Sequence, residues 1–309
     1  PQTIAHTDDP ETNFNPANPT NLRAFLTVVG TQPDTRVRIA PSTVVVAGMG
    51  IEQTRPGQYI EAVLQPFEVL NLETGDFNVD FTGTLVEADG PVLAFSGSEA
   101  SDAPYFDRLA NRFCCADHFE EQLDPLRTAG TSFFAAHAPN RSAAVSQAGA
   151  SLLGVVPEPE FFRILSVADR PVHIQTTLPE PDDKLELPGR GAYLDLIAYR
   201  DFHIDADGPI MLASVQASQD AAGVRRGLPG GDPSLLIIPP IEQYRANYVF
   251  LTPDKYAFDF VVIVASTEAL VTLDGQDVME AGCARAAADG LTDQERGSSH
   301  SPAWVYRCQ

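Results

Sequence analysis

Basic residues are scarce in this sequence, and lysine is nearly absent. The chain has 42 Asp and Glu against 20 Lys and Arg, for a formal net charge of −22, and its only lysines are Lys184 and Lys255. A surface that binds nucleic acid or anionic lipid headgroups needs clustered Lys and Arg, and no basic run or basic amphipathic helix is present. The composition therefore excludes nucleic acid and the membrane surface as partners, and solubility accounts for the acidity.

Long apolar runs are also missing. The longest uninterrupted run is Phe260 to Ala265, far short of the roughly 20 residues that a spanning helix needs, so we expect no membrane insertion. The numbering starts at Pro1 without an initiator Met, a basic leader or an apolar signal core. We interpret the sequence as a processed or excised chain.

The usual catalytic motifs are absent as well. His118 is followed by Phe-Glu-Glu-Gln, without the second histidine of the zinc protease helix. The serine-glycine stretch at residues 96–99 does not form the elbow that exposes a nucleophile, and the glycines near Gly227 lie among prolines as in an exposed loop. We therefore predict that the chain is not an enzyme and uses no cofactor or metal.

Prolines interrupt the sequence often, with 25 in 309 residues, so long helices have little room. Runs such as Thr35 to Ile39, Val172 to Thr176 and Tyr193 to Ile197 alternate or concentrate apolar and branched residues. The pattern predicts an all-β fold. One segment departs from it, because apolar residues follow helical spacing from Phe106 until Pro125, and there we predict a short helical insertion near residues 105–123.

An internal repeat is the most informative feature of the sequence. Residues 160–174 align without gaps with residues 259–273, and residues 26–39 fit the same frame. In each copy an apolar strand leads through a polar turn into an alternating strand. We interpret the element as a β-hairpin that occurs three times.

Two further elements recur. Residues 88–93 match residues 206–211, each with an Asp-Gly-Pro turn, and residues 123–135 match residues 238–250. The third copy of the hairpin has no Asp-Gly-Pro element after it. We therefore expect its sheet to lack a strand, which a continuation beyond Gln309 or another chain would supply.

The repeats predict tandem β-sandwich-like units, with a propeller-like arrangement as the alternative. The expected divisions are an N-terminal extension at residues 1–21, a first β unit with the helical insertion at 22–145, a second β unit at 146–255, and an incomplete third unit at 256–309.

The four cysteines form an even set. Cys283 and Cys308 flank a polar loop, so we predict a disulfide between them, which would contribute roughly 3 kcal/mol by restricting the unfolded chain. Such a bond indicates an exported protein. For the adjacent Cys114 and Cys115, reduced core thiols or a longer bridge are favoured over a bond between the two, because that bond requires a strained ring.

A polar motif lies around residue 120, in the run Asp-His-Phe-Glu-Glu-Gln-Leu-Asp-Pro, after a Gly-Pro-Val-Leu-Ala-Phe-Ser-Gly segment at residues 90–97. The motif residues are Asp117, His118, Glu121, Gln122, Leu123 and Pro125. This arrangement resembles the IgGFc-binding protein N-terminal domain family, which is widespread in bacterial exported proteins. The similarity runs from about Leu22 through the third hairpin. Two of the family's cysteine positions differ, because Ala116 and Glu99-Ala100 stand where the family has cysteine. Antibody binding is not implied, because no residue here can be matched to that property.

Three functional hypotheses follow. The first is a non-enzymatic exported protein of the cell surface or extracellular matrix, with a structural or adhesive role, that binds proteins or glycans. The second is a carbohydrate-active or other hydrolase with dispersed carboxylates, which requires two buried carboxylates about 5 to 10 Å apart at the base of a cleft. The third is a subunit of a larger extracellular assembly, whose third unit is completed by strand donation.

Overall fold

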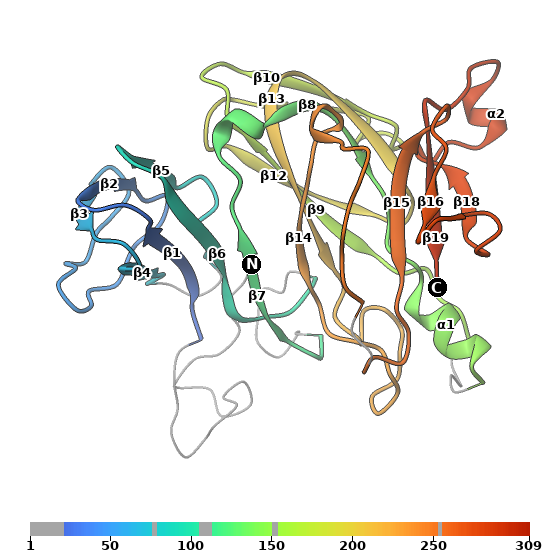
Figure 1. Cartoon of the computed structure of the whole chain (residues 1–309), viewed down its shortest axis with the longest axis horizontal. Helices are drawn as coiled ribbons and strands as arrows, with labels where there is room; N and C mark the ends of the chain where they lie inside the picture. Colours follow the sequence, from blue (N-terminus) through green and yellow to red (C-terminus); the bar gives the residue numbers. More distant parts are fainter. Residues whose placement is uncertain (1–21, 76–78, 105–112, 150–153, 253–254) are drawn as a thin grey trace.

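The computed structural model describes residues 22–75, 79–104, 113–149, 154–252 and 255–309. The regular structure of the described chain consists of β-strands in several sheets, with only short helices. The all-β prediction is therefore confirmed (Figure 1). No helix in this part of the chain is long and apolar enough to span a membrane.

We call the strands β1 to β7 the first unit. They form a four-stranded antiparallel sheet in the order β4-β1-β6-β7 and a three-stranded sheet in the order β3-β2-β5. The apolar residues between the two sheets form one core cluster, which includes Leu26, Val28, Ile39 and Leu72. The strands are β1 (Ala24–Gly30), β2 (Thr35–Ala40), β3 (Ile60–Leu64), β4 (Val69–Glu73), β5 (Leu85–Ala88), β6 (Val92–Ser101) and β7 (Asp117–Gln122).

The second unit comprises β8 to β14 and is organised around one long strand, β13. Its first half pairs with β10 and β8, and its second half pairs with β9 and β14. The apolar faces enclose the largest core cluster, which includes Phe133, Phe162 and Phe202. The strands are β8 (Gly130–Ala135), β9 (Glu160–Ser166), β10 (Val172–Thr176), β11 (Lys184–Leu187), β12 (Tyr193–Ala198), β13 (Phe202–Gln216) and β14 (Leu235–Ile238). The helix α1 (Arg141–Gln147) and the 3-10 turns η2 (Leu126–Thr128) and η3 (Ile241–Gln243) lie in the connections.

The first two units share one topology. β1 lies between β4 and β6, and β9 lies between β12 and the second half of β13; likewise β2 lies between β3 and β5, and β10 lies between β11 and the first half of β13. The register agrees as well, because Leu26 faces Ser96 and Phe162 faces Ser214, each serine five residues after the proline of Asp-Gly-Pro. The Asp-Gly-Pro sequence separates β5 from β6, whereas β13 continues through it.

The third unit comprises β15 to β19. Its three-stranded sheet has the order β15-β19-β18, and β16 pairs with β17. The Cys283–Cys308 disulfide is present, as the sequence predicts, and both cysteines lie in the core cluster of this unit. The elements are β15 (Val261–Ser266), β16 (Thr272–Leu273), β17 (Gln276–Asp277), β18 (Ala284–Ala287), α2 (Asp293–Arg296) and β19 (Ala303–Cys308).

The repeated hairpin of the sequence analysis is wrong in its pairing. The two strands of each copy are present and adjacent in sequence, but β1 does not pair with β2, β9 does not pair with β10, and β15 does not pair with β16. Each copy is an arch, which leads the chain from one sheet or half-sheet to another. The polar turn is conformationally special in the first copy, where Asp34 has φ 56°, a left-handed conformation that Asp tolerates.

The helical insertion is also wrong where the structure describes it. Residues 117–122 form the strand β7, which pairs antiparallel with β6. Residues 105–112 of the expected insertion lie outside the described residues. The domain boundaries remain a prediction. β8 falls within the predicted first unit at residues 22–145, but it pairs with β13, so we group it with the second unit.

Candidate protein-interaction face

The family-like motif occupies β7 and the turn that follows it. β7 lies at the edge of the four-stranded sheet, where Gly97 of β6 permits its close approach: a Cβ atom on Gly97 would lie 1.7 Å from the carbonyl oxygen of Phe119. Because β-strand side chains alternate between faces, the motif residues divide into an inward set and an outward set. The structure brings all six together on one strand and its exit.

The inward set supports the first unit. Leu123 packs against the core cluster and donates its backbone N–H to the carbonyl of Ala94. The Thr128 N–H and hydroxyl both donate to the carbonyl of Pro125, which closes the η2 turn. Burial raises the pKa of Glu121, and the negative charge of Asp124 raises it further. Leu123 and Pro125 therefore explain part of the motif as local structure.

The outward set lies on the opposite face of the sheet. His118 stacks on Phe25 of β1, with ring centroids 5.5 Å apart and an interplanar angle of 16°. Its Nε2 lies 3.4 Å from a carboxylate oxygen of Glu120. Gln122, two residues further along β7, faces Phe95 of β6. The motif thus contributes polar groups to one margin of an exposed sheet face.

The centre of that face is apolar. Val69 of β4, Val29 of β1 and Leu93 of β6 lie directly opposite one another and form a row across three strands. The Val69 side chain is 59% exposed and that of Leu93 is 41% exposed. In the next row, Thr27 donates its hydroxyl to Asn71 at 2.7 Å and faces Phe95. We call this surface the outer face and define it by Val69, Val29, Leu93, Phe95, Asn71, Thr27, His118, Glu120 and Gln122.

An exposed aromatic residue adjoins the outer face. Phe67 lies in the turn between β3 and β4, where the N–H of Glu68 donates to the carbonyl of Gln65 and Pro66 occupies the second position. Phe67 has φ 67°, in the third position of the turn, which favours glycine. The residue is 88% exposed, so little packing within the chain offsets the cost of this conformation, and such outliers are often retained for function. No sequence motif marks Phe67, and the Pro-Phe pair within a turn was the available signal.

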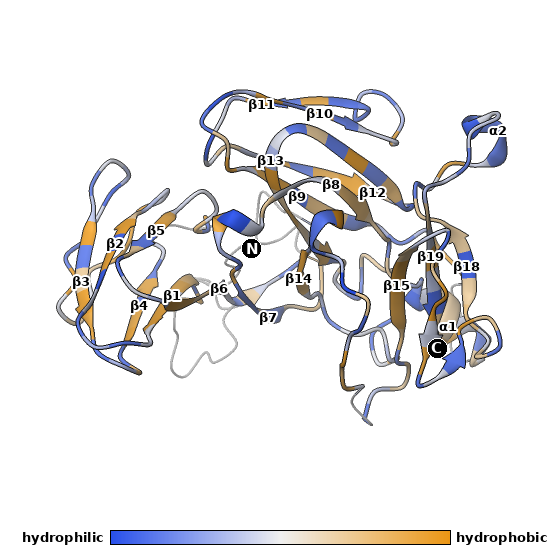
Figure 2. Ribbon diagram, turned by 45° about the horizontal axis from the view of Figure 1, so that its top comes forward, coloured by the Kyte–Doolittle hydropathy of each residue, from blue (hydrophilic) through white to orange (hydrophobic). Residues whose placement is uncertain are grey.

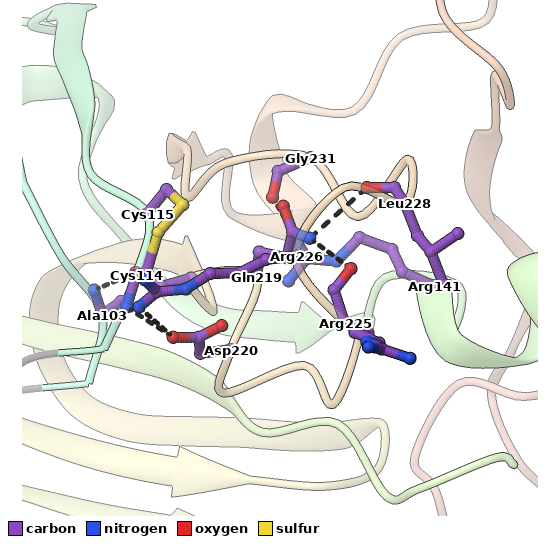
Figure 3. Close-up of a disulfide and its surroundings, with 11 residues drawn as sticks. Ala103, Cys114, Cys115, Arg141, Gln219, Asp220, Arg225, Arg226, Leu228 and Gly231 are labelled. Carbon is purple, nitrogen blue, oxygen red and sulfur yellow. Dashed lines mark hydrogen bonds and ion pairs between the residues drawn. A yellow bond between two sulfur atoms is a disulfide. The ribbon is translucent and has the colours of Figure 1, made fainter. Parts of the chain in front are cut away.

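The cysteine pair before β7 is bonded, contrary to the sequence-based expectation. Cys114 and Cys115 form a vicinal disulfide. Figure 3 shows the pair against Asp220 of the second unit: the Cys114 N–H donates to the Asp220 carboxylate at 3.1 Å, and the Asp220 N–H donates to the Cys114 carbonyl at 2.7 Å. These contacts hold the chain that leads into β7 against the second unit, a tertiary arrangement that the adjacency of the two cysteines does not reveal.

Buried carboxylates, which the hydrolase hypothesis calls for, lie in the second unit, and Glu158 and Glu160 are two of them. Glu158 binds Arg141 at 2.6 Å. Glu160 accepts hydrogen bonds from the Ser214 hydroxyl and, at 2.7 Å, from the Ala138 N–H. Burial raises the pKa of Glu160, although these hydrogen bonds act to lower it. Because internal donors bind both carboxylates, they serve the packing of the unit in this arrangement.

A groove of about 370 Å³ lies between the second and third units. Its arginines join the two units: Arg307 pairs with Asp201 and donates to the His137 carbonyl at 2.7 Å, and Arg200 pairs with Glu295 at 3.0 Å. Hydrogen bonds from Thr292 and Arg200 lower the pKa of Glu295 to about 2. The groove's charged groups thus hold the interface together, which makes the outer face the stronger candidate site.

These features define an all-β, disulfide-bonded protein whose candidate site is the face of a sheet. The family model described as IgGFc binding protein matches residues 6–305, nearly the whole chain. The chain therefore belongs to this family, and the resemblance carried by the β7 motif is confirmed. No curated protein and no solved structure matches the chain.

Proposed function

We propose that this chain is a non-enzymatic, exported protein of the cell surface or extracellular space that binds another protein through its outer face. Membership of a family described as IgGFc binding protein supports a protein partner. The two disulfides support an oxidising, exported environment.

The observation that carries the proposal is the exposed apolar row beside Phe67. Aromatic anchors surrounded by apolar and then polar residues are typical of protein interfaces. Here Phe67 is the anchor, Val69 and Leu93 extend the apolar area, and His118 and Glu120 form part of a polar margin. A sheet face of this kind binds by shape and apolar contact, without a reaction.

The proposal is tested by surface plasmon resonance of the chain on an immobilised panel: an IgG Fc fragment, a secreted mucin, a fibrous matrix protein and a glycan array. We expect saturable binding to at least one protein. The Phe67→Ala and Leu93→Ser variants should weaken that binding by about tenfold or more, as hot-spot truncations do.

The matched control is Leu270→Ser, because Leu270 is 97% exposed and lies outside the outer face. This variant should bind as the unmodified chain does. Binding that Leu270→Ser weakens and Phe67→Ala leaves unchanged would place the interface elsewhere. Binding to glycans alone, or to none of the surfaces, would refute a protein-binding outer face.

A further inference from the structure

The third unit has an open sheet edge whose place in the fold can be identified. In β1 and β9, the core-facing residues direct their backbone groups to β4 and β12 respectively. Gly30, an even-numbered residue in step with the core residues Leu26 and Val28, donates its N–H to Glu68 beside β4. Ser166, in step with Phe162 and Ile164, donates its N–H to Ala192 beside β12. The residues that alternate with them bond to β6 and β13.

The same comparison shows which strand of the first two units β19 corresponds to. In β15 the odd-numbered residues, Val261 and Ile263 among them, face the core of the third unit, whereas Val264 packs on the other face against a cluster that includes Phe134 of the second unit. Thr267, in step with Val261 and Ile263, donates its N–H to Pro302 beside β19. Because the side of a strand to which a residue bonds follows from the face on which its side chain lies, β19 takes the place of β4 and β12. The opposite edge of β15 is the place of β6 and β13.

That opposite edge has no strand partner among the residues that the structure describes. The backbone groups of Val262 and Val264 point to it, because these residues alternate with the ones that bond to β19. Figure 2 shows β15 in hydrophobic colour. The edge therefore combines the apolar side chains of β15 with backbone groups that bond to no other described strand.

A second observation marks the same place. β8 follows η2 and pairs with the first half of β13, where Phe133 and Ala135 are fully buried. The corresponding segment after η3, residues 247–251, pairs with no described strand, and its apolar side chains are exposed: Val249 at 101% and Leu251 at 90%. A strand in the position of β13 would cover this segment and the edge of β15 together.

We propose that the third unit binds an extended segment of a partner protein that takes the position of β13. The segment pairs antiparallel with β15 through its second half, and its first half lies between β16 and residues 247–251. This is β-strand addition at a sheet edge, in which main-chain hydrogen bonds give affinity and alternate side chains give specificity. The interaction is separate from the outer face and does not depend on it.

The chemistry of the partner segment follows from the two strands that fill the equivalent position in this chain. Residues 88–96 read Ala-Asp-Gly-Pro-Val-Leu-Ala-Phe-Ser, and residues 206–214 read Ala-Asp-Gly-Pro-Ile-Met-Leu-Ala-Ser. Both have Asp-Gly-Pro followed by apolar and small residues. The partner segment therefore carries an Asp-Gly-Pro sequence with apolar residues on the core side of the strand that follows it.

The test uses the whole chain and a synthetic peptide with the sequence of residues 202–216. NMR amide exchange of the chain is measured with and without the peptide, and fluorescence anisotropy gives the affinity. We expect saturable binding with new protection of the Val262 and Val264 amides. The Ile263 amide, which bonds to β19, should be protected in both states.

Two matched controls test the mode of binding. A peptide of the same composition in scrambled order should bind at least about tenfold more weakly, because strand addition requires the ordered pattern. The same loss is expected for a peptide N-methylated at the positions of Met211, Ala213 and Val215, the residues whose backbone groups face β9 in this chain, because strand addition also requires free main-chain donors. The Val262→Pro variant removes one donor from the open edge and none from the β19 side, and the Val262 side chain is exposed. It should therefore weaken binding of the peptide without loss of the β15–β19 pairing. Equal binding of all peptides would overturn the proposal.

Two other outcomes would also overturn it. Protection of the Val262 and Val264 amides in a monomer without peptide would show that the chain covers this edge itself. The same protection in a concentration-dependent dimer would show that a second copy is the occupant. The Phe67→Ala and Leu93→Ser variants should bind the peptide as the unmodified chain does, because the outer face and the edge of β15 are separate surfaces. Failure of one proposal can therefore be distinguished from failure of the other.

Discussion

The ion pair between Arg141 and Glu158 offers the sharpest prediction of stability. The Arg141 guanidinium contacts one carboxylate oxygen of Glu158 at 2.6 Å, and the Arg141 backbone N–H donates to the other oxygen at 2.9 Å. The side chains are only 15% and 4% exposed. The guanidinium also donates to the carbonyls of Gly230, at 3.0 Å, and Ala217. One arginine thus joins α1, the chain before β9 and the loop after β13.

Replacing this arginine leaves a charge without its partner. In Arg141→Ala the Glu158 carboxylate stays buried and keeps the backbone N–H of residue 141 as a donor but loses the guanidinium. Removal of one partner of a buried pair costs about 3–5 kcal/mol. Total stabilities of about 5–15 kcal/mol are usual, so the variant should lose a large fraction of its free energy of unfolding. Urea unfolding followed by circular dichroism measures the loss. The Arg141→Met, Glu158→Gln double variant should be more stable than Arg141→Ala, because it buries no charge.

An exposed pair provides the control. Arg190 binds Asp169 at 2.6 Å, but the two side chains are 41% and 79% exposed. Solvent screens such pairs, so Arg190→Ala should leave the urea midpoint almost unchanged. If Arg141→Ala and Arg190→Ala had equally small effects, the Glu158 carboxylate would be solvated in the variant and the argument from burial would be refuted.

Three further predictions concern backbone conformation and protonation. Gly290→Ala should lower the melting temperature strongly, because Gly290 has φ 66° and a Cβ atom there would lie 1.7 Å from the Asp201 carbonyl oxygen; an unchanged melting temperature would contradict this packing of the third unit on the second. Phe67→Gly should be more stable than Phe67→Ala by up to about 1 kcal/mol in urea unfolding, the reverse of the usual order, because only glycine adopts a positive φ freely. Burial lowers the pKa of His203 from 6.5 although Asp205 opposes the shift; the unfolded state therefore takes up the proton first, and the stability that His203 contributes should fall as the pH drops below about 6.5. His203→Gln should flatten this part of the urea-unfolding profile between pH 7.5 and 5.5, and an identical profile would show that His203 does not titrate as proposed.

The strands were predictable from local pattern, whereas their partners were not. In β9 every second residue is buried, which is the alternation that a sequence reveals directly. The sequence repeat also located the arches correctly, from β1 to β2 and from β9 to β10. A short polar turn between two strands is compatible with a hairpin or an arch, because the choice depends on which sheet each strand joins. That information lies in tertiary packing, so the pairing could not be predicted.

The strand β7 shows how charge can conceal an edge strand. Its sequence, Asp-His-Phe-Glu-Glu-Gln, has one apolar residue, and Phe119 is the only one of the six that is buried. Helical spacing connects Phe119 with apolar residues on either side in the sequence, and this connection favoured a helix. Polar edge strands are common because charge protects a sheet edge from pairing with other chains. The apolar periodicity that identifies core strands is therefore weakest at the strand that carries the motif.

The outer face was beyond sequence analysis for a related reason. β1 reads Ala-Phe-Leu-Thr-Val-Val-Gly and is apolar on both faces, a pattern that sequence analysis assigns to a strand buried on both sides. In the structure one face of β1 covers the core, through Leu26 and Val28, and the other face carries Val29 in the row between Val69 and Leu93. A two-sided apolar strand, in a sheet that the described residues cover on one side, has more apolar surface than this fold needs for its own core. Contact with a partner would bury that excess, so the disagreement between the pattern and the fold marks the face that we assign to binding.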